Sequence, residues 1–183
     1  MRGGEVNWPF SSAARQRFVQ NAYHVGDLDE AIMRWHRLFG IGPFIVRRNI
    51  ALGSVHYRGA PSELHISAAH AQAGPVQIEL IVQHCDTPST FRDMYKGGEE
   101  GIHHVALFPE DHDAMVAHYA AQGCAVTTDI VTAEGRGASY VDCRQQIGHM
   151  IEIYRVNQSL FDFYDTIADA AARWDGRQLV IEY

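Results

Sequence analysis

The sequence lacks three kinds of segment that would define its class at once: a basic run, a long apolar run and paired cysteines. Lys and Arg number 15 against 22 Asp and Glu in 183 residues, which gives a net charge of -7. A nucleic-acid surface needs clustered Lys and Arg to neutralise phosphates, and the sequence has no such cluster. The composition therefore argues against a nucleic-acid partner.

No stretch approaches the ~20 apolar residues of a membrane-spanning helix, and the N-terminal residues contain no apolar signal-peptide core. The three cysteines are odd in number and include no C-x-x-C pair, which is typical of free thiols in a reducing compartment. These absences predict a cytoplasmic protein without a membrane partner. The apolar content of 46% is that of an ordinary globular chain, with one domain or two small ones.

What the sequence does contain is a weak internal repeat. Moving 84 positions along the chain takes Gln20 to His104, and both lie in apolar strands that precede a helical pattern. Each half then ends on an apolar strand that holds one carboxylate, Glu79 or Glu152. We expect the chain to divide into an N-terminal arm at 1–17, a first module at 18–83, a connector at 84–101, a second module at 102–156, and a C-terminal helix and short strand at 157–183.

The polar side chains within these strands are the candidates for chemistry: Gln20, Glu79, His104 and Glu152. A carboxylate inside an apolar run is costly to bury without a partner, and a bound cation removes that cost. Nitrogen and oxygen donors from both halves would suit a six-coordinate divalent metal with open positions for water. A second interpretation stays open, in which Glu79 belongs to a polar strand face that is exposed to water.

His103 and His104 are neighbours in the sequence, so strand alternation places them on opposite faces. At most one of them is then expected to share a pocket with Gln20. A single histidine in a strand is more often a hydrogen-bonded structural group than a metal ligand.

Four segments resemble the vicinal oxygen chelate superfamily, which comprises glyoxalase, bleomycin-resistance and dioxygenase proteins, and most closely its methylmalonyl-CoA epimerase and glyoxalase-like branch. They are QNAYHVGDLDEAIMRWHRLFGIGPF (20–44), PVQIELI (75–81), GIHHVALFPED (101–111) and GHMIEIY (148–154). The resemblance covers about residues 18–155. It implies an α+β fold in which two βαβββ modules form an open cup-shaped mixed sheet of the glyoxalase-like type.

The resemblance also implies a metal site on the inner wall of the cup, with ligands from the first and last strands of each module. Carried over by motif, the ligands are Gln20, Glu79, His104 and Glu152, around one divalent ion (Co, Zn, Ni, Mn or Mg). His104 is preferred to His103 because it directly precedes Val105, as the family's ligand does. Epimerase-like members usually carry His at the first position, so Gln20 is a departure that weakens the transfer of a particular substrate.

The activity implied by the resemblance is that of a metal-dependent lyase, isomerase or epimerase. Such enzymes abstract a proton alpha to a carbonyl through a metal-held enediolate, and their substrates are small carbonyl or thioester compounds. Glu79 and Glu152 are the candidate catalytic bases, and both could equally be plain ligands.

Two alternatives remain open. An Fe(II) ring-cleaving dioxygenase needs two His and one carboxylate, and Gln20 stands where one of those His residues would be. A metal-free protein that binds a small aromatic compound would use aromatic side chains such as Phe91, Tyr95 and Tyr140 to line its cavity.

The tail has its own pattern, with a cap signal at Ser159 and a stop at Gly176. Between them, large side chains recur at helical spacing: Leu160, Phe163, Tyr164, Ile167, Ala171 and Trp174. We expect this helix to pack on the outside of a module or across a twofold interface, in a homodimer. Docking on its own subunit stays open as the alternative.

Overall fold

The computed structural model describes residues 17–183, so the predicted N-terminal arm lies outside the described residues except for Arg17. The first half consists, in order, of β1 (Arg17–His24), α1 (Leu28–Phe39), β2 (Phe44–Arg47), β3 (Leu52–Tyr57), β4 (Ala60–Pro61), β5 (Ile66–Ala73) and β6 (Val76–Gln83). The remainder consists of β7 (Gly101–Phe108), α2 (His112–Ala121), β8 (Val126–Thr132), β9 (Gly137–Asp142), α3 (Arg144–Ile147), β10 (Met150–Arg155), α4 (Gln158–Arg173) and β11 (Val180–Glu182). Between residues 17 and 183, no helix has the length and apolar content that a membrane span requires.

Within residues 17–183 the strands form one mixed sheet in the order β11-β2-β5-β6-β1-β7-β10-β9-β8-β3-β4. The order contains the same four-strand arrangement twice, as β2-β5-β6-β1 and as β8-β9-β10-β7. In each copy, the strand that comes first along the chain pairs in parallel with the strand that comes last: β1 with β6, and β7 with β10. The two copies are joined by antiparallel pairing of β1 with β7. This confirms the predicted α+β fold of two βαβββ modules.

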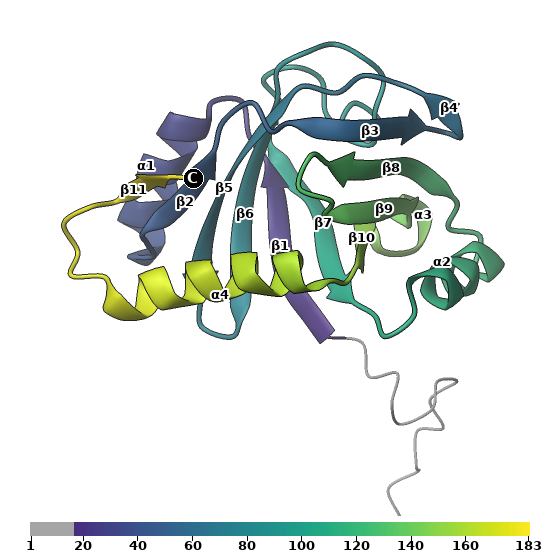
Figure 1. Ribbon diagram of the computed structural model, residues 1–183. Helices are drawn as coiled ribbons and strands as arrows, with labels where there is room; N and C mark the ends of the chain where they lie inside the picture. The colour runs from purple at the N-terminus through teal and green to yellow at the C-terminus, as the bar shows by residue number, and fades with distance from the viewer. Residues whose placement is uncertain (1–16) are drawn as a thin grey trace, which may run out of the picture.

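An insertion between β2 and β5 distinguishes the first module from the second. Its strand β3 leaves its own module and pairs antiparallel with β8 of the other one, as the crossing strand at the top of Figure 1 shows. A short segment of the first module is thereby paired with the edge strand of the second module.

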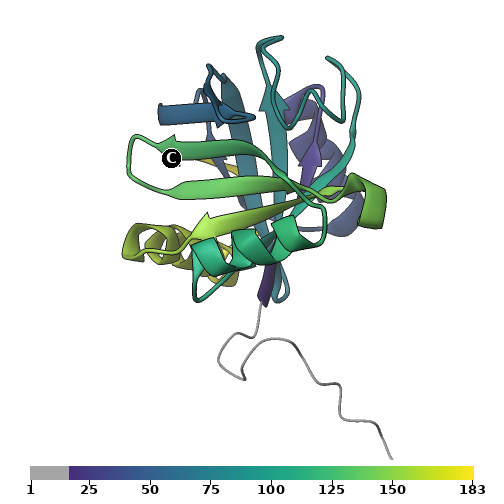
Figure 2. The ribbon, with the colours of Figure 1, turned by 90° about the vertical axis from the view of Figure 1, so that its right-hand side faces the viewer.

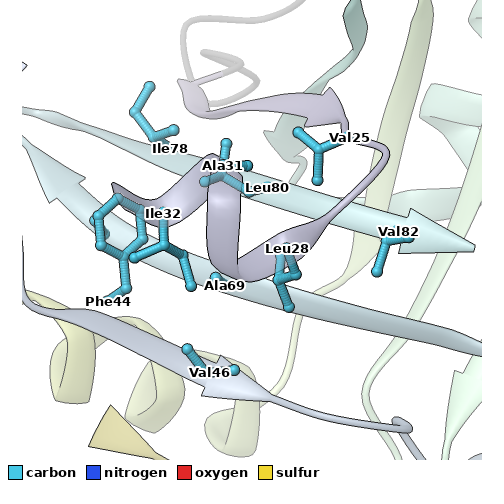
Figure 3. Close-up of a cluster of buried hydrophobic side chains, with 11 residues drawn as sticks. Val25, Leu28, Ala31, Ile32, Phe44, Val46, Ala69, Ile78, Leu80 and Val82 are labelled. Atoms are coloured by element: carbon cyan, nitrogen blue, oxygen red, sulfur yellow. The ribbon is translucent and has the colours of Figure 1, made fainter. Parts of the chain in front are cut away.

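Helix α1 covers the outer face of the first module. Its N-cap is Asp27, whose side chain accepts a hydrogen bond from the Glu30 backbone N–H at 2.9 Å; Asp and Glu at this spacing are typical of a helix start. Its buried side chains Leu28, Ala31 and Ile32 pack against the sheet (Figure 3). Fully burying a large apolar side chain contributes ~1.5–3 kcal/mol, so this face fixes the helix firmly on the sheet.

Helix α4 crosses the opposite face of the sheet from α1, in front of β5 and β6 in Figure 1 and on the left in Figure 2. Its N-cap is Asn157, whose side chain accepts from the Leu160 backbone N–H, so the predicted cap at Ser159 is wrong by two residues. Three side chains at helical spacing are buried: Leu160, Phe163 and Ile167. The tail then returns as β11, which pairs parallel with β2 and anchors the end of the helix.

The predicted packing of this helix on the outside of a module is wrong. Ile45 of β2 and His70 of β5 are register partners whose side chains face α4, and Phe163 packs against both. The helix therefore buries its apolar stripe on the inner wall of its own chain. That placement confirms the alternative in which the helix docks on its own subunit.

Candidate metal and substrate site

A pocket lies between the inner face of the sheet and α4. It has a volume of about 60 Å³ and is lined by both modules and by the helix. Glu79 and Glu152 line one part of it, and Arg47 and Arg136 line another, with Phe163 of α4 over the pocket. The pocket thus has an acidic part and a basic part.

The strand register places the two carboxylates at equivalent positions in the two modules. Glu79 of β6 is the register partner of Ala22 in β1, and Glu152 of β10 is the partner of Ala106 in β7. These partners are 84 positions apart, which is the spacing of the repeat in the sequence. The same spacing relates Gln20 to His104, so the four predicted ligands occupy two pairs of equivalent sites.

Three of the four predicted ligands converge. The facing atoms of Glu79, His104 and Glu152 all lie within 4.8 Å of one another. His104 Nε2 is 3.3 Å from Glu79 Oε2 and 3.1 Å from Glu152 Oε2. Glu79 is only 7% exposed and Glu152 only 3%. The interpretation in which Glu79 looks at water is therefore wrong.

The donor set fits a divalent cation. Glu79 Oε2, His104 Nε2 and Glu152 Oε2 are buried and, among the described residues, have no well-aligned hydrogen-bond partner. Such orphaned atoms are costly unless something satisfies them. An imidazole nitrogen and two carboxylate oxygens are ordinary ligands for Zn and similar ions, so one bound cation would satisfy all three.

The pKa shifts in the cluster also show that a positive charge between the two carboxylates is favourable. Burial would lower the pKa of His104, but Glu152 and Glu79 outweigh it and raise the pKa to about 9. Burial would likewise raise the pKa of Glu79, but contacts with His104 and His70 hold it well below its usual range. A proton on His104 thus supplies the positive charge that a metal ion would supply in its place.

His103 fixes the orientation of His104. A β-bulge in the pairing of β1 with β7 leaves His103 as the extra residue, so the predicted placement of the two rings on opposite faces is wrong. His103 Nε2 lies 3.1 Å from the Thr90 carbonyl oxygen, and the Nδ1 atoms of the two histidines are 2.8 Å apart. Burial and the charge of His104 lower the pKa of His103 well below the ordinary value.

These contacts assign the ring protons. A carbonyl only accepts, so His103 Nε2 donates to Thr90, and the Nδ1 of neutral His103 is left as an acceptor. His104 Nδ1 must then be the donor, which leaves His104 Nε2 to face the two carboxylates. Metal-binding histidines are typically held in this way, through a hydrogen bond from the nitrogen that does not ligate.

Gln20, the fourth predicted ligand, is fully buried at the equivalent position to His104. Its Oε1 accepts a hydrogen bond from the Tyr154 hydroxyl at 3.1 Å, and its Nε2 has no partner among the described residues. Its carbonyl oxygen is thus engaged by Tyr154, which itself lines the pocket. Its role as a ligand remains a prediction.

The sequence interpretation missed His70. His70 Nε2 lies 3.1 Å from Glu79 Oε1, and the two residues are register partners in β5 and β6. Strand β5 runs from Ile66 to Ala73 and places His70 on the inner face. A polar residue within an apolar run, the signal that identified Glu79, would also have identified His70.

The aromatic candidates separate into two groups. Tyr140, the register partner of Glu152, lines the pocket. Phe91 instead stacks on His103 with ring centroids 4.5 Å apart, and Tyr95 stacks on His24 at 5.4 Å. Phe91 thus packs against the histidine that orients His104, and Tyr95 packs against His24, which is not one of the three clustered residues.

Two equivalent modules whose first and last strands bring His104, Glu79 and Glu152 into one buried cluster define a class of proteins with this repeated fold. The family model of the Glyoxalase/Bleomycin resistance protein/Dioxygenase superfamily matches residues 19–141. The chain therefore belongs to this superfamily, also called vicinal oxygen chelate. No curated protein matches the sequence significantly.

Solved structures with the same fold include a methylmalonyl-CoA epimerase from Mycobacterium tuberculosis. It is 19% identical, with a TM-score of 0.53, over 84% of this chain and 95% of that one. A hypothetical protein from Bacillus halodurans C-125 is 15% identical, with a TM-score of 0.54, over 79% of this chain and 96% of that one. At these identities the likeness is one of fold.

Proposed function

We propose that this protein is a metal-dependent lyase, isomerase or epimerase that abstracts a proton alpha to a carbonyl group. The observation that carries the proposal is the buried cluster of Glu79, His104 and Glu152, contributed by the end strands of both modules. Two carboxylates beside one histidine combine metal-ligating atoms with a group able to accept a proton.

A divalent cation, when bound, is a Lewis acid that polarises the substrate carbonyl and so acidifies the adjacent C–H bond. His104 Nε2, Glu79 and Glu152 would hold it, with Gln20 as a possible fourth ligand. His103 would keep the His104 ring in the orientation that presents Nε2.

We assign the roles of the two carboxylates from their neighbours. Glu79 lies between two imidazoles, with Oε1 at 3.1 Å from His70 Nε2 and Oε2 at 3.3 Å from His104 Nε2. Glu152 is in contact with one imidazole, that of His104, through Oε2, and its other neighbour is the neutral hydroxyl of Tyr140, its cross-strand partner. Glu79 is therefore the more constrained ligand, and Glu152 is the better candidate to receive the substrate proton.

Exchange of carbon-bound hydrogen with solvent tests the proposal directly. The metal-loaded protein in D₂O, given a panel of 2-oxo thioesters and hemithioacetals, should replace the proton alpha to the carbonyl with deuterium, as followed by proton NMR. Glu152→Gln should abolish exchange, and Glu63→Gln, an exposed carboxylate outside the pocket, should leave it intact. Absence of exchange across the whole panel would count against proton abstraction.

Elemental analysis separates this proposal from its alternatives. One equivalent of a non-iron divalent metal per chain is expected. Stoichiometric iron would favour the ring-cleaving dioxygenase, and a full absence of metal would favour a binding protein for a small aromatic compound.

The substrate class that we propose is a small carbonyl or thioester compound. We also propose a homodimer, whose interface would lie elsewhere than on the apolar stripe of the tail, because α4 buries that stripe within its own chain. Light scattering of the full chain decides the oligomeric state, with a mass twice that of the 20.5 kDa chain expected for the dimer.

A further inference from the structure

The basic part of the pocket has no role in the proposed proton transfer. Arg47 stands at the end of β2 in the first module, and Arg136 stands in the turn between β8 and β9 in the second. Both line the pocket, and their side chains are only 11% and 7% exposed. Burying a charged group is costly unless it is paired, so the partners of these two guanidiniums are informative.

The two arginines share a single carboxylate. Glu134 Oε2 accepts from Nη2 of Arg47 and from Nη2 of Arg136, each at 3.1 Å. Within residues 17–183, neither arginine has an ion pair with any other carboxylate. Glu134 thus balances only one of the two guanidinium charges at contact distance, and the other is opposed at longer range by Glu79, in a pocket closed off from bulk water on one side by α4. Burial and the nearby Arg136 both lower the pKa of Arg47, which is the expected effect of this imbalance.

The guanidinium carbons of both arginines lie over the ring of Phe163. Its centroid lies 5.5 Å from the Arg47 guanidinium carbon and 4.9 Å from that of Arg136. A cation–π contact attracts the charge of a guanidinium and needs no hydrogen-bond acceptor, so it does not satisfy the N–H donors. Each arginine has five such donors and uses one, from Nη2, on Glu134. Donors for a further anion therefore remain on both.

We propose that Arg47 and Arg136 form an anion subsite that binds a carboxylate or phosphate group of the substrate. The subsite rests on the proposed function only in one respect: the other end of the substrate would carry the reacting carbonyl, next to Glu79 and Glu152. The substrate class is thereby narrowed to carbonyl compounds that carry an anionic group. A cavity of about 60 Å³ accommodates a small acid group, whereas pockets for drug-sized ligands measure roughly 300–1,000 Å³.

The test is an NMR titration of the protein with succinate, inorganic phosphate and uncharged succinamide. It is run on the protein as purified and again after EDTA treatment, so that binding at the metal site is seen separately. Wild type should bind an anion and not succinamide, and the tighter of the two anions identifies carboxylate or phosphate as the group recognised.

Two variants with opposite expected effects make the test specific. Arg136→Met keeps an apolar side chain of similar length in the pocket, and anion binding should weaken by about 10–100-fold, the usual effect of losing a hydrogen bond to a charged group. Glu134→Gln removes the internal competitor of the anion, so binding should tighten. The matched control is Arg155→Met, because Arg155 pairs with Asp129 at 3.0 Å and does not line the pocket.

Equal anion affinity in Arg136→Met and Arg155→Met would overturn the subsite, as would weaker binding in Glu134→Gln or equal binding of succinate and succinamide. A purely structural role of the arginines predicts that Glu134→Gln weakens binding. Should proton exchange fail while these anion results hold, the proposed function falls and the subsite stands. If proton exchange is intact and Arg136→Met leaves anion affinity unchanged, the subsite falls and the proposed function stands.

Discussion

The two modules present a carboxylate at the same position, but each surrounds it differently. Glu79 has His70 across the strand pair, and Glu152 has Tyr140 at the corresponding place. On the opening strands, Gln20 of the first module corresponds to His104 of the second. The repeat thus places polar side chains at equivalent positions in the two modules. The residue types at these positions differ, and this difference gives Glu79 and Glu152 different neighbours.

This difference explains how two carboxylates in one cluster can have separate roles. Glu79 lies between two imidazoles, at 3.1 Å from His70 Nε2 and 3.3 Å from His104 Nε2. Glu152 has one imidazole, that of His104, at 3.1 Å. A carboxylate held between two imidazoles suits a ligand, whereas Glu152, beside one imidazole and the neutral hydroxyl of Tyr140, suits proton transfer. The following predictions test that division.

The largest expected effect is that of Glu152→Gln on the rate of proton exchange. An amide can still ligate a metal but cannot accept the proton, so the rate should fall by about 10²–10⁴-fold while most bound metal is retained. Exchange rate and metal content are measured on the same preparation. A parallel loss of both would make Glu152 only a ligand and remove the distinction between the modules.

His104→Ala should lower metal content sharply, because it removes the nitrogen that faces both carboxylates. Metal content after dialysis, measured by mass spectrometry, gives the result. Full occupancy in His104→Ala together with loss in His103→Ala would show that the ligand is one residue earlier than proposed.

His103→Ala should have a smaller effect than His104→Ala. It removes the acceptor that orients the His104 ring, and loss of such an outer partner typically lowers metal affinity by about 10–100-fold. Competition with a fluorescent chelator measures the affinity. Unchanged affinity would mean that the hydrogen bond between the two rings does not orient the ligand.

The smallest expected effect is that of His70→Gln, which removes one of the two imidazoles on Glu79. Metal affinity should fall by about tenfold, at the weak end of the range for outer partners. Tyr140→Phe is the matched change in the other module and should leave affinity nearly unchanged. A larger loss in Tyr140→Phe than in His70→Gln would reverse the roles assigned to the two carboxylates.

The strand pattern and the repeat predicted the two modules, and the repeat places Glu79 and Glu152 at equivalent register positions. They did not identify His70, which β5 places on the inner face, and they failed at His103, because a bulge replaces regular alternation. Strand ends and bulges depend on pairing with neighbouring strands, so a single segment does not reveal them.

The sequence by itself determined the two modules, the capped helix α1 and the polar positions inside apolar strands, because periodicity and capping act over a few residues. Only the tertiary structure decided that α4 closes the pocket from the inner side and that Arg47, Arg136 and Glu134 meet. Arg47 lies 87 positions from Glu134 along the chain. An apolar helical stripe specifies that something must be buried against it, and the shape of the whole sheet selects the surface that does so.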